Sequence, residues 1–233
     1  MLTRLAVAWR GDLRCGFPTC RKDVVMIANR CSVGVLCVAA SLVAGCFGSI
    51  KTTVSFCKGE ADLAVALPEL RTRLHSPDSN VRALATIAAG TWGEEARELV
   101  ADLTANLGHS RKAVRLGAAT ALSAMGKDAK EAVPQLVSLL ADADMAVRKA
   151  TAVALCSMGG HAQPAVPRLI SLLNDKDASV RKIAALALAS IAKDKPGACR
   201  SAVPNLRRME ASDADTSVRE VAGASLKVVE GRE

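Results

Sequence analysis

The apolar positions of this chain follow two helical patterns that alternate along its last two thirds. In the clearer pattern, apolar residues follow a Val-Arg pair at steps of three and four, as in Val180, Ile183, Ala184, Ala187 and Leu188. This 3.6-residue period predicts an amphipathic helix with one buried face. The pair occurs five times, at Val81-Arg82, Val114-Arg115, Val147-Arg148, Val180-Arg181 and Val218-Arg219.

A second apolar stripe begins thirteen or fourteen residues before each of these valines. It runs, for example, from Val166-Pro167 to Leu172-Leu173, which favours a helix with proline in its first turn. The valines are 33, 33, 33 and 38 residues apart, and a fixed period of this size indicates a solenoid. We therefore predict an all-α, right-handed α-solenoid of about five helix pairs. The expected repeats are residues 61–93, 94–126, 127–159, 160–195 and 196–230.

Polar residues and glycines mark the ends of the expected helices. An aspartate stands three residues before four of the five valines, where its carboxylate can cap exposed helix N–H groups. The second repeat has Arg111 there, which leaves its cap to Ser110 or to water. Gly93, Gly126 and Gly159 suit a left-handed turn after the Val-Arg helix. Ala192 and Glu230 replace that glycine in the last two copies.

The combined pattern, V-P-x-L-x-x-L-L followed by D-x-D-x-x-V-R-x-x-A, resembles the HEAT repeat, and in particular its short bacterial form in phycobilisome lyases. The resemblance covers roughly residues 61–230. It implies a structural ladder of hydrogen bonds between repeats, made by a turn aspartate and the arginine six residues later. That arrangement corresponds to Asp142 with Arg148, Asp175 with Arg181 and Asp213 with Arg219.

The first two repeats depart from the ladder pattern. They offer Ser76 with Arg82 and His109 with Arg115, so the ladder is open to question at that end. Five aligned arginines could alternatively form an anion-binding stripe.

The N-terminal third is of another kind. Twenty residues without a charge separate Arg30 from Lys51, and they include Val43-Ala44-Gly45-Cys46, which resembles the lipobox of bacterial lipoproteins. That resemblance implies a lipid on Cys46, a signal peptide at residues 26–45 and a linker at residues 46–60. Residues 1–25 would then be an extension from an upstream start. The alternative is an uncleaved hydrophobic transmembrane helix. Both alternatives anchor the protein to a membrane of the bacterial cell envelope and place the repeats outside the cytoplasm.

Charge and composition narrow the function. The net charge of +8 falls to about +4 if residues 1–45 are removed, since they carry six basic and two acidic residues. Few aromatic residues follow Cys46, which disfavours binding of nucleic acid through base stacking. A di-iron hydroxylase with HEAT repeats would need His-Glu pairs, and the three histidines are followed by Ser, Ser and Ala. We expect no cofactor and no metal.

What remains is a non-catalytic scaffold that binds a protein or peptide partner. The curved stack should present a groove along its Val-Arg helices, at positions two, six and nine residues after each valine. The residues expected to bind a partner there are Leu116, Lys149, Val153, Lys182 and Leu186. The alternatives are an accessory enzyme of the HEAT type, similar to a bilin lyase or a hydroxylase, and a HEAT-like protein that binds nucleic acid.

Overall fold

The computed structural model describes residues 63–232, which contain helices and no strand. One helix of each pair carries the Val-Arg sequence. These helices are α2 (Ser79–Trp92), α4 (Lys112–Met125), α6 (Met145–Met158), α8 (Ala178–Asp194) and α10 (Thr216–Glu230). Their partners are α1 (Leu63–Leu74), α3 (Val100–Asn106), α5 (Val133–Leu139), α7 (Val166–Leu172) and α9 (Val203–Ser212). Short 3₁₀ helices connect the pairs, namely η2 (Gly93–Leu99), η3 (Gly126–Ala132), η4 (Gly159–Ala165) and η5 (Arg200–Ala202).

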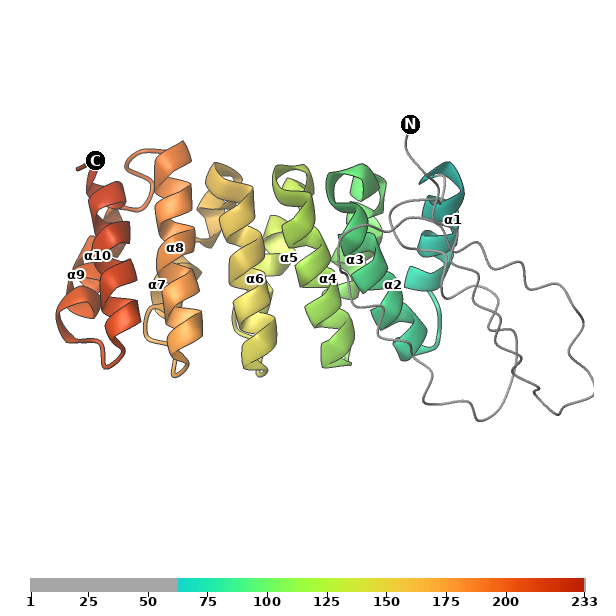
Figure 1. The fold of residues 1–233 in the computed structure, drawn as a ribbon, viewed down its shortest axis with the longest axis horizontal. Coiled ribbons are helices and arrows are strands. Elements are labelled where there is room, and N and C mark those ends of the chain that lie inside the picture. Colours follow the sequence, from blue (N-terminus) through green and yellow to red (C-terminus); the bar gives the residue numbers. More distant parts are fainter. Residues whose placement is uncertain (1–62, 233) are drawn as a thin grey trace, which may run out of the picture. The chain divides into compact units, whose positions relative to one another are not determined.

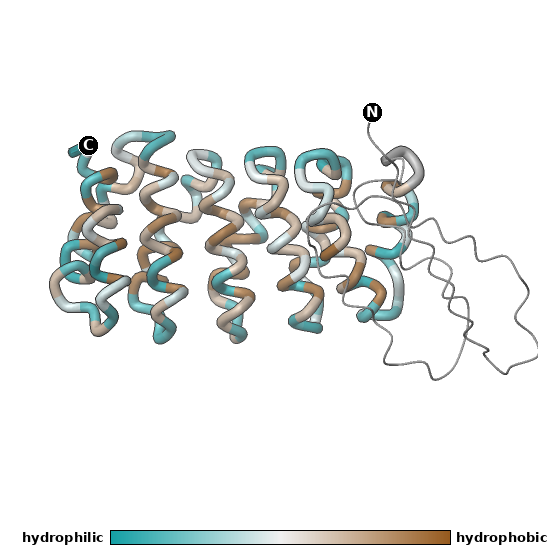
Figure 2. The backbone as a smooth tube through the Cα atoms, in the orientation of Figure 1, coloured by the Kyte–Doolittle hydropathy of each residue, from teal (hydrophilic) through white to brown (hydrophobic). Residues whose placement is uncertain are grey.

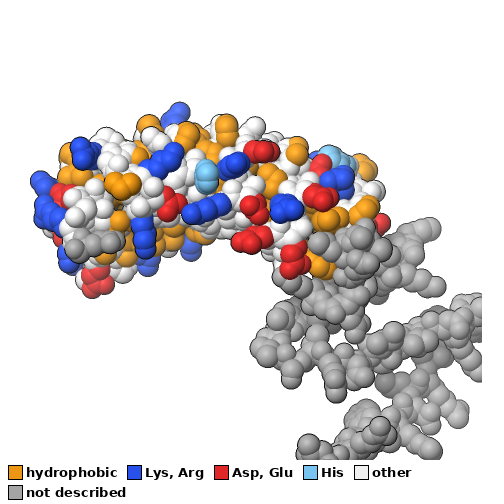
Figure 3. Space-filling model, turned by 90° about the horizontal axis from the view of Figure 1, so that it is seen from above, with side chains coloured by type: hydrophobic (Ala, Val, Ile, Leu, Met, Phe, Trp, Pro, Cys, Tyr) orange, Lys and Arg blue, Asp and Glu red, His pale blue; other side chains and the backbone are white. Residues whose placement is uncertain are grey.

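The helices form two layers, with the even-numbered helices side by side in one row and the odd-numbered helices behind them (Figure 1). Each even-numbered helix packs directly against the next, whereas α3 and α5 meet the following repeat mainly through its 3₁₀ helix. Rows that differ in spacing produce a curved array, and the curvature of this unit is visible in Figure 3. The prediction of an all-helical solenoid is confirmed for the described residues.

Small residues let the even-numbered helices approach closely. Val114, Val147, Val180 and Val218 are fully buried, as are most of the alanines that follow them. A side chain placed on Gly117 would lie 2.0 Å from the Thr86 hydroxyl, so α2 and α4 meet at a distance that only glycine permits. Hydrophilic residues gather at the turns at both ends of the helices (Figure 2). The core is therefore a continuous strip between the two layers.

Glycine is required at the corners of the first three repeats. Gly93, Gly126 and Gly159 have φ between 53° and 55° and ψ between −126° and −131°. This conformation has the positive φ that the sequence predicts, but it lies outside the left-handed helical region and is essentially restricted to glycine. It turns the chain at once into the following 3₁₀ helix.

The expected aspartate caps are present. The carboxylates of Asp78, Asp144, Asp177 and Asp215 accept hydrogen bonds from N–H groups in the first turn of the next helix. Arg111 takes this position before α4 and makes no side-chain cap.

Several expectations lie outside the described residues. They are the N-terminal hydrophobic helix, the signal peptide, the linker at residues 46–60 and the lipid on Cys46. Among the described helices, none has both the length and the apolar composition needed to cross a bilayer.

Candidate functional site

Arginine and aspartate side chains join successive repeats along the edge where the two helices of each pair connect. Arg148 donates hydrogen bonds from Nε and Nη2 to the two carboxylate oxygens of Asp175 in the next repeat, at 2.8 and 2.9 Å. Arg115 binds Asp142 in the same way, at 2.7 and 3.0 Å, and Arg181 binds Asp213 at 2.7 and 2.6 Å. Paired bonds of this kind between charged groups are both strong and directional. They fix the relative position of neighbouring repeats.

The remaining edge of each arginine binds its own repeat. Nη1 of Arg148 donates to the main-chain oxygen of Asp142, six residues earlier, at 3.0 Å. Arg181 and Arg219 make the same bond to the main-chain oxygens of Asp175 and Asp213. The aspartate and arginine that the resemblance pairs within a repeat are thus joined through the aspartate's main-chain oxygen. The aspartate's carboxylate is bound instead by the arginine of the preceding repeat.

The two ends of this ladder differ from its middle. Arg82 meets no carboxylate, and its Nη1 lies 3.3 Å from the side-chain oxygen of Asn106. Because the partner comes from the next repeat, His109 does not prevent Arg115 from forming a full pair with Asp142. Arg219 belongs to the last described repeat, and its guanidinium donates to Asp213 and Thr216 alone among the described residues.

Both groups of each central pair are held in their charged forms. Burial raises the pKa of the Asp175 carboxyl, but hydrogen bonds from Arg148 and from the Asp177 N–H outweigh it, so the pKa lies below its usual range. The same balance lowers the pKa of Asp142. At Asp213 the hydrogen bond from Arg181 is the main cause of the lowered pKa. Arg148 is 8% exposed and has a raised pKa because of its bond to Asp175.

These contacts bear on the alternative of an anion-binding stripe. Arg115, Arg148 and Arg181 use both edges of their guanidinium groups for contacts inside the array. An external anion would have to displace an aspartate that is already buried and bonded. The geometry therefore argues for a structural ladder at these three positions.

The predicted groove residues all lie on the row of even-numbered helices. Lys149 and Leu186 are exposed, and Leu116, Val153 and Lys182 are half-buried. Ile87, at the position on α2 equivalent to Leu186, is 59% exposed, and Leu186 itself is 39% exposed. Leu84 and Met145 are also strongly exposed on this row of helices, which the sequence pattern did not indicate.

The groove face carries more lysine than carboxylate. Lys149 and Lys182 occupy the same position on α6 and α8, and neither is in an ion pair within residues 63–232. Lys112 is different, because its ammonium group lies 3.0 Å from Asp144. The face therefore combines exposed apolar side chains with lysines that are outside ion pairs, although Lys182 lies near enough to Asp215 to lower the pKa of that carboxyl. This combination suits a partner that offers apolar and acidic residues.

The reactive side chains of the described region have structural roles. His75 lies 2.9 Å from Asp102, and His109 accepts a hydrogen bond from the Arg111 N–H. Burial raises the pKa of the Cys199 thiol to about 11 and also raises that of Cys156. A thiol with a raised pKa is a poor nucleophile at neutral pH. The described residues contain no cluster of three or more His, Cys, Asp or Glu residues suited to a metal ion.

Comparison with known proteins agrees with this architecture. The family model for HEAT repeats matches residues 67–156 and 133–227. None of the curated proteins is detectably similar to the chain.

Solved structures share the fold. An engineered protein from a structural genomics consortium is 25% identical, with 73% of this chain and 85% of that chain covered and a TM-score of 0.60. A computationally designed armadillo repeat protein for modular peptide recognition is 24% identical, with coverages of 71% and 82% and a TM-score of 0.61. The complex of CpcE and CpcF of phycocyanin lyase from Nostoc sp. PCC7120 is 22% identical, with coverages of 70% and 98% and a TM-score of 0.54.

Proposed function

The chain belongs to the HEAT-repeat family, and from this premise we propose that it is a non-catalytic scaffold, held at a membrane by its N-terminal segment, that binds a protein partner. The partner would lie along the face formed by α2, α4, α6, α8 and α10. The observation that carries the proposal is the exposure of apolar side chains at equivalent positions of this face, namely Ile87 on α2 and Leu186 on α8. Exposed apolar side chains that recur along one surface are typical of sites that bind other proteins.

Further support comes from relatives and from charge. One structural neighbour was designed for modular peptide recognition, and another is a complex of two chains of a lyase. Lys149 and Lys182 would attract acidic residues of a partner and set its direction along the groove. The raised pKa values of Cys156 and Cys199 disfavour cysteine catalysis.

Photo-crosslinking tests the binding face. A benzoylphenylalanine residue introduced at Ile87 or Leu186 should crosslink the same partner in cells of the native host. A matched residue at Gln135, exposed on α5 in the other layer, should not. Equal crosslinking from Gln135, or none from the two groove positions, would contradict the proposal.

The tether requires a separate measurement. We propose that Cys46 is lipidated and that the repeats lie outside the cytoplasm of a bacterial cell, because Val43-Ala44-Gly45-Cys46 lies near the end of an uncharged segment and resembles a lipobox. The intact mass of the protein from native membranes should show an acylated N-terminal Cys46 that is lost in Cys46→Ala. An unmodified chain that stays in the membrane would indicate an uncleaved anchor, and an unmodified soluble chain would exclude both forms of tether.

A further inference from the structure

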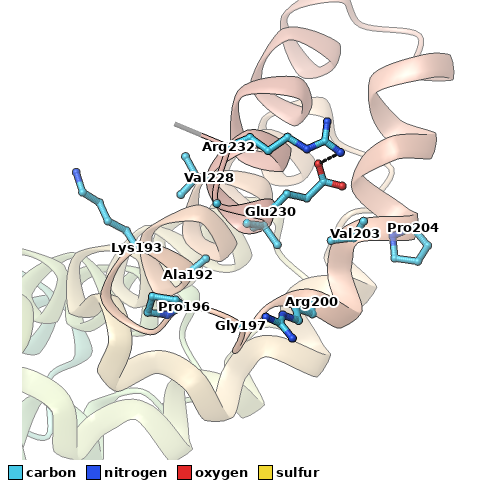
Figure 4. A pocket seen from close by; sticks show the side chains of 12 residues that line it. Ala192, Lys193, Pro196, Gly197, Arg200, Val203, Pro204, Val228, Glu230 and Arg232 are labelled. Atoms are coloured by element: carbon cyan, nitrogen blue, oxygen red, sulfur yellow. Dashed lines mark ion pairs between the residues drawn. The ribbon is translucent and has the colours of Figure 1, made fainter.

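A cleft of about 850 Å³ lies between α8, the start of α9 and the end of α10. Its volume lies within the range of sites that accept small ligands or short peptide segments. In Figure 4, Ala192 and Lys193 of α8 lie on one side of the cleft and Val203 and Pro204 of α9 on the other. Pro196, Gly197 and Arg200 lie at its base, and Val228, Glu230 and Arg232 lie above them. We call it the α8–α10 cleft.

The sequence around this cleft differs from that of the earlier repeats in two respects. The spacing between the last two Val-Arg pairs is 38 residues rather than 33, and α8 has 17 residues where α2, α4 and α6 have 14. Ala192 and Glu230 stand where the first three repeats have the corner glycine, and α8 continues past that position to Asp194, whereas α10 ends at Glu230. In earlier repeats the corners stack, with η2 on η3 and η3 on η4.

The surroundings hold the cleft in a fixed shape. Asp194, in the added turn of α8, accepts a hydrogen bond from the Gly160 N–H at 3.0 Å and pairs with Lys127 at 3.2 Å. Lys195 donates to Gln163 at 3.0 Å. The buried Cys199 anchors the loop that follows. A preformed site loses little conformational entropy when a ligand binds.

Positive charge dominates the lining. Lys193, Arg200 and Arg232 are exposed. Glu230 is the one carboxylate among the lining residues, and Arg207 and Arg232 neutralise it at 2.6 Å each. The Arg200 side chain makes no hydrogen bond or ion pair within residues 63–232, and its main-chain N–H donates to the Gly197 carbonyl. Basic side chains also gather at the α9 and α10 end of the array (left in Figure 3).

The position of Arg200 is well suited to an anionic group. Gly197 has φ of +87°, and the Arg200 guanidinium lies near it, with Nε 3.5 Å from the position that a Cβ atom would take. The guanidinium thus lies beside Gly197, and its N–H groups are free of the other described residues. Apolar walls made by Pro196, Val203, Pro204 and Val228 surround it. A free phosphate would leave these walls uncovered, whereas an acidic peptide would place apolar side chains on them.

We propose that the α8–α10 cleft binds a short acidic segment of a protein partner, with a carboxylate on Arg200 and apolar side chains on the proline and valine walls. This inference deepens the proposed scaffold function and rests on it, but it concerns a site separate from the groove face.

Fluorescence anisotropy tests the inference on the full-length chain in detergent. The probe is a fluorescein-labelled peptide, acetyl-EDLEDL-amide, and its neutral counterpart is acetyl-QNLQNL-amide. Arg200→Gln should weaken binding of the acidic peptide by about tenfold, since it removes a charge-assisted hydrogen bond. The matched variant Arg168→Gln removes an equal charge from exposed α7 and should change the affinity by less than about twofold. Melting temperatures establish that both variants are folded.

The outcomes separate this inference from the proposed function. Equal binding of the neutral peptide, an equal effect of Arg168→Gln, or displacement by millimolar inorganic phosphate would overturn the cleft as a peptide site. If Lys149→Gln and Lys182→Gln weaken binding of the acidic peptide and Arg200→Gln does not, the peptide binds the groove face. That result would rule out the cleft as the peptide-binding site and would leave the proposed scaffold function in place.

Discussion

Each central arginine of the ladder contacts two repeats at once. The guanidinium of Arg148 is bound to the main chain of its own turn through Nη1 and to Asp175 of the next turn through Nε and Nη2. Removing one partner of a buried pair leaves the other charge without compensation, and that is far more costly than losing an exposed pair. The ladder should therefore contribute strongly to stability at its buried pairs.

We predict that Arg148→Met lowers the free energy of unfolding by about 3 kcal/mol, because the Asp175 carboxylate would stay buried without its partner. Urea unfolding followed by circular dichroism measures the change. Lys112→Met is the matched control, since Lys112 is 72% exposed in its pair with Asp144, and it should have little effect. Similar losses in both variants would show that the buried pairs have no special role.

The same carboxylates should make the array sensitive to acid. Asp142, Asp175 and Asp213 have pKa values below their usual range in the folded state. Their contribution is fully present above the unfolded pKa of about 3.9 and is lost as the pH falls through the lower folded values. The melting temperature should thus be steady near neutral pH and fall steeply below about pH 4. Asp175→Asn should make that fall shallower, and an unchanged pH profile would contradict the assignment.

At the level of helices, close contact between α2 and α4 depends on glycine. A Cβ atom on Gly117 would lie 2.0 Å from the Thr86 hydroxyl oxygen and 3.1 Å from its Cβ. Thr86 is fully buried and donates its hydroxyl hydrogen bond to the Ala83 carbonyl. Neither group can move without disturbing the packing between the first two repeats.

Gly117→Ala should therefore destabilise the protein, although alanine favours a helix by about 1 kcal/mol over glycine. Thermal unfolding should show a lower melting temperature, and adding Thr86→Ala should restore part of it. Gly108→Ala is the control, because its new Cβ would meet nothing closer than a carbonyl oxygen at 4.0 Å. A stabilised Gly117→Ala variant would mean that the helices separate easily at this point.

The helices and their repeat register could be predicted from the sequence because the signals are local. Capping aspartates such as Asp144, corner glycines such as Gly126 and the apolar period all act within one repeat. The pairing of Arg115 with Asp142 could not be predicted, since it depends on how far one repeat is displaced from the next. The exposure of Leu84 is equally non-local. The α8–α10 cleft had a signal in the 38-residue spacing and in Ala192 and Glu230, but its lining required the structure.

At the level of the whole molecule, stability arises from contacts between neighbours. The buried core forms one continuous cluster from Ala66 to Val229, with no repeat buried by itself. Unfolding of one central repeat should expose the faces of both neighbours. A single charge in the core should thus affect the complete array.

Leu188→Asp provides the test, because Leu188 is fully buried in α8 and an aspartate there would be a buried charge without a partner. We expect the Leu188→Asp variant to be largely unfolded near room temperature and to show no cooperative melting transition by circular dichroism. Leu186→Asp, two residues earlier on the same helix and 39% exposed, should melt close to the unchanged protein. Equal melting of both variants would show that the buried face of α8 is assigned wrongly.

The rungs of the ladder differ in strength along the array. Its first rung, Arg82 with Asn106, is a single bond of 3.3 Å to a neutral side chain, whereas the later rungs are doubly bonded ion pairs. In the fourth repeat, Asp194 and Lys195 at the end of α8 bind Gly160 and Gln163, and Asp194 also pairs with Lys127 of the third repeat. A pulling force applied at the first described repeat would reach this neutral rung before the ion pairs. The contacts of Arg71 and His75 with Asp102, and of Asn106 with the Leu74 carbonyl, would then carry the load between the first two repeats.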